Sequence, residues 1–152
     1  MFSERQVAVG DVLVGADAPV AVQSMTNTRT EDVEATLHQI RALATAGAVI
    51  VRVAVPDEKA AGAVNRLVAE SPVPLIADVH FDHTLAVAAL QAGAAGVRIN
   101  PGNIGGDDKV REVVEAVKAR GAVIRVGVNS GSLQRDLREL EERDPAGALV
   151  ES

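Results

Sequence analysis

The strict alternation of short apolar runs with helix-like segments restricts the fold of this chain more than any other feature. Five runs are rich in Val, Ile and Ala, and they cover residues 20–25, 49–55, 73–80, 96–100 and 122–129. Strands that are apolar on both faces belong to sheets buried on both sides, and helical connections join the strands of parallel sheets. The sequence therefore predicts an α/β protein whose parallel sheet is covered by helices.

Helix boundaries can be predicted from capping residues. We expect Thr30 to cap the first helix, with Glu31 and Asp32 in its first turn and Gly47 as its stop. Further helices are expected after Pro56–Asp57, over Thr84–Ala92, over Asp107–Arg120, in the charged stretch 133–144 and after Pro145. A glycine-rich loop, "PGNIGG" at 101–106, is expected before the Asp107 helix.

The units repeat, which favours a TIM-type barrel. "AGAVIVRV", "AGAAGVRI" and "RGAVIRV" each place an Arg a few residues after a helix-ending Gly, as in successive βα units. We expect residues 1–16 to form a capping β-hairpin around Gly10–Asp11, and residues 17–152 to form the first βα units. A complete (βα)8 barrel needs ~250 residues, so about five strands of eight are expected and the chain is interpreted as part of a longer protein.

A complete doubly wound domain of the flavodoxin type is the alternative fold for this length. Such domains carry a phosphate-binding loop after the first strand. Here the first strand is followed by "TNTRT", which contains no glycine. The incomplete barrel is therefore the preferred interpretation.

Composition excludes several functional classes. The chain has no cysteine, which rules out thiolate metal sites and disulfides within these residues. The net charge of −6 argues against nucleic-acid binding. No apolar run approaches the ~18 residues of a membrane span, and the N-terminus has no apolar signal core. These features lead us to expect a cytoplasmic protein that binds neither membranes nor nucleic acid.

Three of the apolar strands carry an arginine, at positions 52, 98 and 125. A buried unpaired charge costs several kcal/mol, so each guanidinium needs a partner. Residues two apart on a strand face the same way, and barrel enzymes carry their chemistry at the C-terminal strand ends. This parity collects one set of polar residues on one face: Arg52, Asp78, His80, Arg98, Asn100, Arg125 and Asn129. Because Arg offers bidentate donors, we expect a binding site for phosphate or diphosphate.

Other interpretations of these residues stay open. A single arginine within a strand is more often a salt-bridged or edge-strand residue. The Asp-x-His spacing of Asp78 and His80 is compatible with a metal site, but we prefer that Asp78 pairs an arginine and His80 donates a hydrogen bond to substrate. Backbone amides of the 101–106 loop are a further candidate for anion binding, whereas His38 and His83 are expected to lie outside the site.

Four motifs carry a family resemblance: "VAVQSMTNT", "ADVHFD", "VRINPGNIG" and "IRVGVNSGSL". From about Val20 to Ser152 the chain resembles the N-terminal barrel of the 4-hydroxy-3-methylbut-2-enyl diphosphate synthases. The resemblance implies an oxidoreductase of isoprenoid biosynthesis by the methylerythritol phosphate pathway. Such an enzyme reductively opens and dehydrates 2-C-methyl-D-erythritol 2,4-cyclodiphosphate with two electrons.

The resemblance also implies partners and residue roles. The family joins the (βα)8 barrel to a C-terminal domain with a 4Fe–4S cluster, receives electrons from flavodoxin or ferredoxin, and works as a homodimer. Carried onto this chain, the pattern makes Arg52, Arg98 and Arg125 diphosphate ligands, with Asp78 and His80 touching substrate and Asn100 and Asn129 lining the same mouth.

This chain departs from the family pattern because the cluster ligands and the iron–sulfur domain are absent from it. We therefore expect it to carry part of the diphosphate site, to bind no cofactor and to be inactive alone. Two alternatives remain: a non-catalytic anion-binding or interaction domain, and a barrel similar to the pterin-binding synthases.

Overall fold

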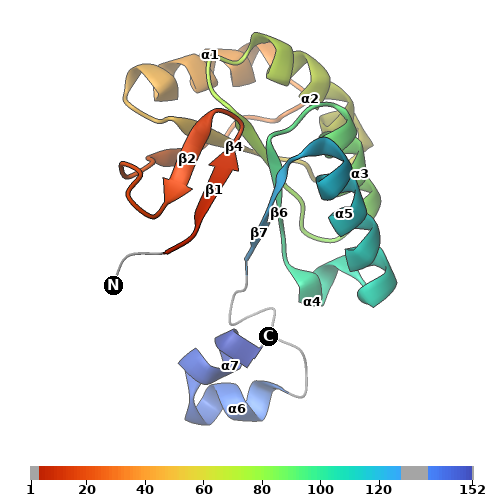
Figure 1. The fold of residues 1–152 in the computed structure, drawn as a ribbon. Coiled ribbons are helices and arrows are strands. Elements are labelled where there is room, and N and C mark those ends of the chain that lie inside the picture. The colour runs from red at the N-terminus through yellow and green to blue at the C-terminus, as the bar shows by residue number, and fades with distance from the viewer. Residues whose placement is uncertain (1–3, 128–136, 152) are drawn as a thin grey trace.

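The computed structural model describes residues 4–127 and 137–151, and its arrangement is shown in Figure 1. The chain begins with the predicted hairpin, in which β1 (Gln6–Val9) pairs antiparallel with β2 (Val12–Gly15). Gly10 makes the turn with φ +60°, a left-handed conformation that glycine adopts without steric cost. The expected hairpin is thus confirmed.

A five-stranded parallel sheet follows the hairpin. Its order is β3-β4-β5-β6-β7, so each strand lies beside its neighbours in sequence. The strands are β3 (Gln23–Met25), β4 (Ile50–Ala54), β5 (Leu75–Asp78), β6 (Gly96–Ile99) and β7 (Val123–Val126). Sequential parallel order is the order of a TIM barrel, and the switch in strand order of a doubly wound sheet does not occur in the part of the chain described.

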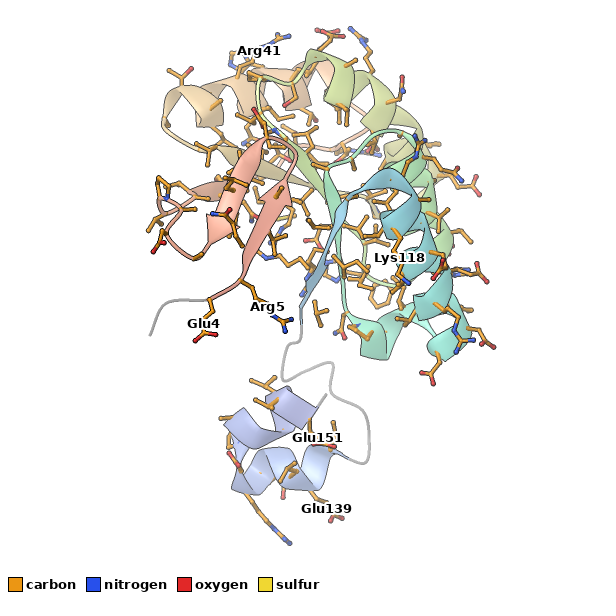
Figure 2. The ribbon with its side chains drawn as sticks, in the orientation of Figure 1. Glu4, Arg5, Arg41, Lys118, Glu139 and Glu151 are labelled. Carbon is orange, nitrogen blue, oxygen red and sulfur yellow. The ribbon has the colours of Figure 1, made fainter. Side chains whose placement is uncertain are left out.

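Helices cover one face of this sheet (Figure 1). They are α1 (Val33–Thr45), α2 (Glu58–Glu70), α3 (His83–Gln91) and α5 (Asp107–Arg120), with α4 (Pro101–Ile104) as a single turn before α5. In the second described range lie α6 (Arg138–Arg143) and α7 (Pro145–Glu151), which agree with the predicted helices there. Charged side chains such as Arg41 on α1 and Lys118 on α5 project from the surface (Figure 2).

The two faces of the sheet bury different cores. Val51, Val53 and Val97 point to the helix side, where they are fully buried. Ile50 and Ile76 point to the opposite face, which we call the inner face, and there they pack against Val9 of the hairpin. The alternation follows from strand geometry, in which successive side chains point to opposite sides. The hairpin therefore fills one end of the inner face with apolar side chains.

Three local predictions need correction. The N-cap of α1 is Asp32, which accepts a hydrogen bond from the Ala35 amide, and not Thr30. The buried Thr30 hydroxyl instead donates to the Ala54 carbonyl, which ties the loop after β3 to the end of β4. The first strand of the sheet begins at Gln23, where pairing with β4 starts, and not at Val20, which is exposed.

The third correction concerns the glycine-rich segment. Residues 101–104 form the helical turn α4 and not an open loop, because Pro101 stands at the first helical position, which needs no amide donor. The predicted end of the last strand, at 128–129, lies outside the described residues. No helix in the described ranges is long and apolar enough to cross a membrane.

Candidate anion-binding site

The polar residues predicted from strand parity lie at the C-terminal ends of β4 to β7. Pairing registers place Ala54 beside Asp78, Asp78 beside Arg98, and Arg98 beside Arg125. Arg52 lies two residues before Ala54 on β4, where it is the register partner of Met25 on β3. Because side chains two apart share a face, Arg52 lies on the same inner face as Ile50 and the other arginines.

Asp78 is the centre of this site. Its Oδ2 lies 3.2 Å from Nε of Arg52, and its Oδ1 lies 3.4 Å from Nη1 of Arg98. Asp78 is 4% exposed and Arg98 is 8% exposed, so the pair is held away from water. Two guanidinium groups therefore share one carboxylate. This carboxylate is the partner that the arginines on β4 and β6 require within the sheet. The expectation that Asp78 pairs an arginine is confirmed, and it pairs two.

His80 joins the cluster from the segment after β5. Its Nε2 lies 3.4 Å from Oδ1 of Asp78, and both ring nitrogens lie 3.4 Å from Nη1 of Arg98. The imidazole is about half exposed, whereas the carboxylate below it is buried. This position at the rim leaves the ring available to a bound molecule. The ring of the exposed Phe81 lies next to it, with centroids 5.9 Å apart.

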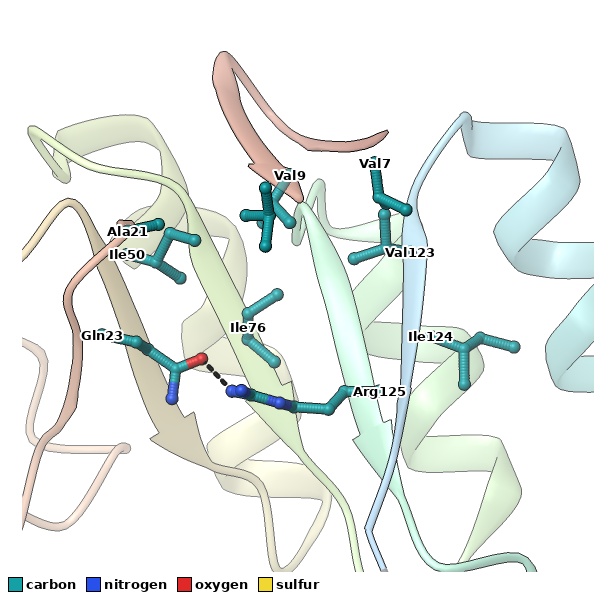
Figure 3. A pocket seen from close by; sticks show the side chains of 10 residues that line it. Val7, Val9, Ala21, Gln23, Ile50, Ile76, Val123, Ile124 and Arg125 are labelled. Carbon is teal, nitrogen blue, oxygen red and sulfur yellow. Dashed lines mark hydrogen bonds between the residues drawn. The ribbon is translucent and has the colours of Figure 1, made fainter. Parts of the chain in front are cut away.

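Arg125 takes a different course from its register neighbour Arg98. Its guanidinium crosses the inner face, and Nη1 donates a hydrogen bond to Oε1 of Gln23 on β3 (Figure 3). The bond joins residues 102 positions apart in sequence and links the two outermost strands of the sheet. Like charges directly opposite on neighbouring strands repel, so the divergence of Arg98 and Arg125 separates two positive groups.

Next to this bridge, on the side of the hairpin, lies an apolar cavity of ≈ 200 Å³ on the inner face. Gln23 and Arg125 stand at its polar end, and the hairpin closes part of it (Figure 3). Its apolar lining consists of Val7, Val9, Val14, Ala21, Ile50, Ile76, Val123 and Ile124. The inner face is therefore divided into an apolar part near the hairpin and a cationic part near the C-terminal strand ends.

Asn100 is positioned by α4 and not by a loop. It is 1% exposed, and its side-chain oxygen accepts a hydrogen bond from the Gly102 amide at 3.1 Å. Its carbonyl also accepts from the Asn103 and Ile104 amides. The Gly102 amide is thus already bonded, which weakens the idea that this segment cradles an anion with free amides. Asn129, the last predicted site residue, lies outside the described residues.

The two remaining histidines do not join the site. His83 begins α3, and its Nε2 lies 3.2 Å from a carboxylate oxygen of Glu112. His38 lies on α1. At the start of α3, the hydroxyl and the backbone amide of Thr84 donate hydrogen bonds to Asp82 and lower the pKa of its carboxyl group. In the described ranges no three His, Cys, Asp or Glu side chains are grouped as a metal ion requires, so the metal interpretation of Asp78 and His80 gains no third ligand.

Sequence reasoning missed the two acceptors on β3. Gln23 and Met25 are both half-buried and point to the inner face, and Nε and Nη2 of Arg52 lie 3.3 and 3.2 Å from the Met25 sulfur. Strand parity puts residues 23 and 25 on one face of their strand. What it cannot give is the pairing across the sheet, because that depends on how strongly the sheet curls.

Comparison with known proteins gives concordant results. The family model described as "GcpE TIM-barrel domain" matches residues 4–152. A 4-hydroxy-3-methylbut-2-en-1-yl diphosphate synthase (flavodoxin) from Aquifex aeolicus is 53% identical over 97% of this chain, which covers 42% of that protein. The Magnetococcus marinus protein of the same name is 57% identical over 97% of this chain and 40% of its own length. The chain thus spans about two fifths of the length of the curated relatives it matches.

Solved structures match at the level of fold. The crystal structure of Yersinia pestis dihydropteroate synthase superposes with a TM-score of 0.63 at 15% sequence identity, over 98% of this chain and 57% of that one. At this identity the likeness concerns the fold alone, and it agrees with βα units of a barrel.

Proposed function

Because the chain belongs to the GcpE TIM-barrel domain family, we propose that it forms the diphosphate-binding part of a 4-hydroxy-3-methylbut-2-en-1-yl diphosphate synthase. The reaction would be the two-electron reductive opening of 2-C-methyl-D-erythritol 2,4-cyclodiphosphate with loss of water. The observation that carries the proposal is the cationic cluster itself. Three guanidinium groups lie on one face, and within the described residues a single carboxylate, that of Asp78, forms ion pairs with two of them, Arg52 and Arg98.

The residues of this cluster would bind and orient the substrate. Arg98 and Arg52 are held by Asp78 and can meet phosphoryl oxygens with fixed donors, and Arg125 would contribute a third guanidinium from β7. His80 at the rim would donate a hydrogen bond to substrate. Asn100 and Asn129 are proposed to line the same mouth. Such preorganised donors favour the diphosphate that develops as a ring C–O bond breaks.

The redox group of the proposed enzyme does not fit the residues of this chain. The resemblance implies a 4Fe–4S cluster held by three cysteines and one glutamate, and these 152 residues contain no cysteine. The described residues likewise offer no group of metal ligands. The chain alone is therefore proposed to bind the substrate without turnover. The relatives' names state flavodoxin dependence, and we propose flavodoxin or ferredoxin as electron donor, a homodimer as the working form and the cytoplasm as the location.

Calorimetric titration of this chain tests the proposal. We expect inorganic pyrophosphate and the cyclodiphosphate to bind, and Arg125→Met to weaken both by ~10-fold or more, the usual order for losing a charged hydrogen-bonding partner. Arg111→Met on the exposed surface of α5 is the matched control and should leave binding unchanged. Absence of binding by the unaltered chain at millimolar ligand would refute the proposal. Binding of a pterin in its place would favour the pterin-binding alternative.

A further inference from the structure

The guanidinium groups of the inner face differ in the kind of acceptor that holds them. Arg98 is bonded to the carboxylate of Asp78, and Arg52 shares that carboxylate. The other acceptor of Arg52 is the thioether of Met25, and Arg125 is held by the amide of Gln23. Both neutral acceptors come from the same short strand, β3.

The neutral acceptors determine the charge of the site. Three guanidinium groups against one carboxylate leave the cluster positive, and within the described residues no carboxylate forms an ion pair with Arg125. An acidic side chain at position 23 would pair with Arg125 in the same geometry, since Glu and Gln have the same shape. Gln23 therefore holds the Arg125 guanidinium by a hydrogen bond, whereas a Glu of the same shape would also cancel its charge.

Gln23 also sets the place of Arg125. The Arg125 side chain is exposed and comes from the outermost strand β7, so it has many rotamers to lose when it binds a ligand. The hydrogen bond to Gln23 draws it across the inner face, past Ile76, to the opposite end of the sheet (Figure 3). An arginine that is already ordered loses less freedom on binding, which raises affinity.

We propose that Gln23 is a positioning residue of the anion site, which holds Arg125 over the inner face and, by its neutrality, keeps the positive charge available to a diphosphate. The inference rests on the proposed function in one respect: it takes the ligand to be a diphosphate-bearing molecule. Met25 gives Arg52 a neutral acceptor in addition to the carboxylate of Asp78.

Two substitutions at the same position separate charge from shape. Gln23→Glu keeps the side-chain length and introduces a carboxylate beside Arg125. We expect it to weaken pyrophosphate binding to the full chain by ~10-fold or more, because the new charge pairs with Arg125 and repels the anion. Gln23→Met supplies a neutral thioether, the acceptor that Met25 offers to Arg52, and should keep the affinity within ~3-fold of the unaltered chain.

The readouts distinguish positioning from a structural role. The melting temperature of Gln23→Glu should not fall, since a salt bridge replaces a hydrogen bond at the same place, whereas a merely structural residue would lose stability and binding together. Gln91→Glu adds the same charge on the exposed surface of α3 and should leave binding unchanged.

Each outcome decides between the two proposals. If the unaltered chain binds no pyrophosphate, the proposed function fails. If it binds, and Gln23→Glu binds equally well, the role of Gln23 is refuted while the anion site stands. A Gln23→Met variant that loses as much affinity as Gln23→Glu, or a control Gln91→Glu that loses it too, would also overturn the inference.

Discussion

At the residue scale, the anion site depends on a position without a side chain. A Cβ atom built on Gly127 would lie 2.1 Å from Nε and 2.6 Å from Cζ of Arg98. The Gly127 amide also donates to the Ile99 carbonyl, which keeps this part of the backbone against β6. Gly127 thereby provides the space in which the Arg98 guanidinium reaches Asp78. Its constraint is steric, since no left-handed backbone angle is involved.

Substituting Gly127 with Ala should therefore displace Arg98. We expect Gly127→Ala to lower the free energy of unfolding by about 1–3 kcal/mol, the usual cost of overpacking, and to weaken pyrophosphate binding. Urea denaturation and calorimetry measure the two effects. Gly62→Ala is the matched control: nothing lies within 4 Å of the added Cβ on α2, and the change should stabilise by about 0.5–1 kcal/mol.

The partner of the clash is tested by a double-mutant cycle. In an Arg98→Met background, the destabilisation by Gly127→Ala should largely disappear, because the guanidinium that the Cβ meets is gone. An equal cost in both backgrounds would show that the backbone, and not Arg98, requires the glycine.

At the element scale, α3 carries a pH-sensitive cap. The Asp82 carboxylate accepts hydrogen bonds from the Thr84 hydroxyl at 2.7 Å and the Thr84 amide at 2.8 Å, and these donors lower its pKa from the ordinary 3.8. A group whose pKa is lower in the folded state contributes stability above its unfolded pKa and loses it as pH falls through the folded pKa. The contribution is therefore present above pH 3.8 and is lost below it.

The variant Asp82→Asn isolates this contribution, because Asn keeps a capping oxygen but does not titrate. At neutral pH the unaltered chain should be more stable than Asp82→Asn, by at most about 1 kcal/mol because Asp82 is exposed. The difference should shrink as pH falls below 3.8. Thermal unfolding of both proteins between pH 7 and strongly acidic conditions measures it, and parallel pH profiles would contradict the assignment.

Element boundaries also show what the sequence can and cannot predict. The start of α2 after Asp57 and the end of α5 at Arg120 were predicted, because capping is decided by a few neighbouring residues. The prediction of Thr30 as the cap of α1 was wrong, because its hydroxyl donates a hydrogen bond to the Ala54 carbonyl on β4. The same distinction holds for the site. Strand parity predicted which face the arginines occupy, but the pairing of Arg125 with Gln23 depends on tertiary structure.

At the scale of the whole molecule, the described part of the sheet ends in two strands, each with a paired neighbour on one side only. β3 and β7 are the ends of the strand order within the described residues, and the inner face between them carries an apolar cavity. An unpaired strand edge next to apolar surface favours association with another chain. We therefore predict that this 152-residue chain self-associates in a concentration-dependent manner.

Sedimentation velocity over a range of concentrations tests this prediction, and one substitution locates the contact. Val126 is 61% exposed on β7, and a lysine there should oppose edge pairing, so Val126→Lys is expected to shift the chain toward the monomer. Val150→Lys adds the same charge to an apolar position on α7 that is 86% exposed, and it should leave association unchanged. A chain that stays monomeric at all concentrations would contradict the prediction. Association that both lysines reduce equally would show that net charge, and not the β7 edge, controls it.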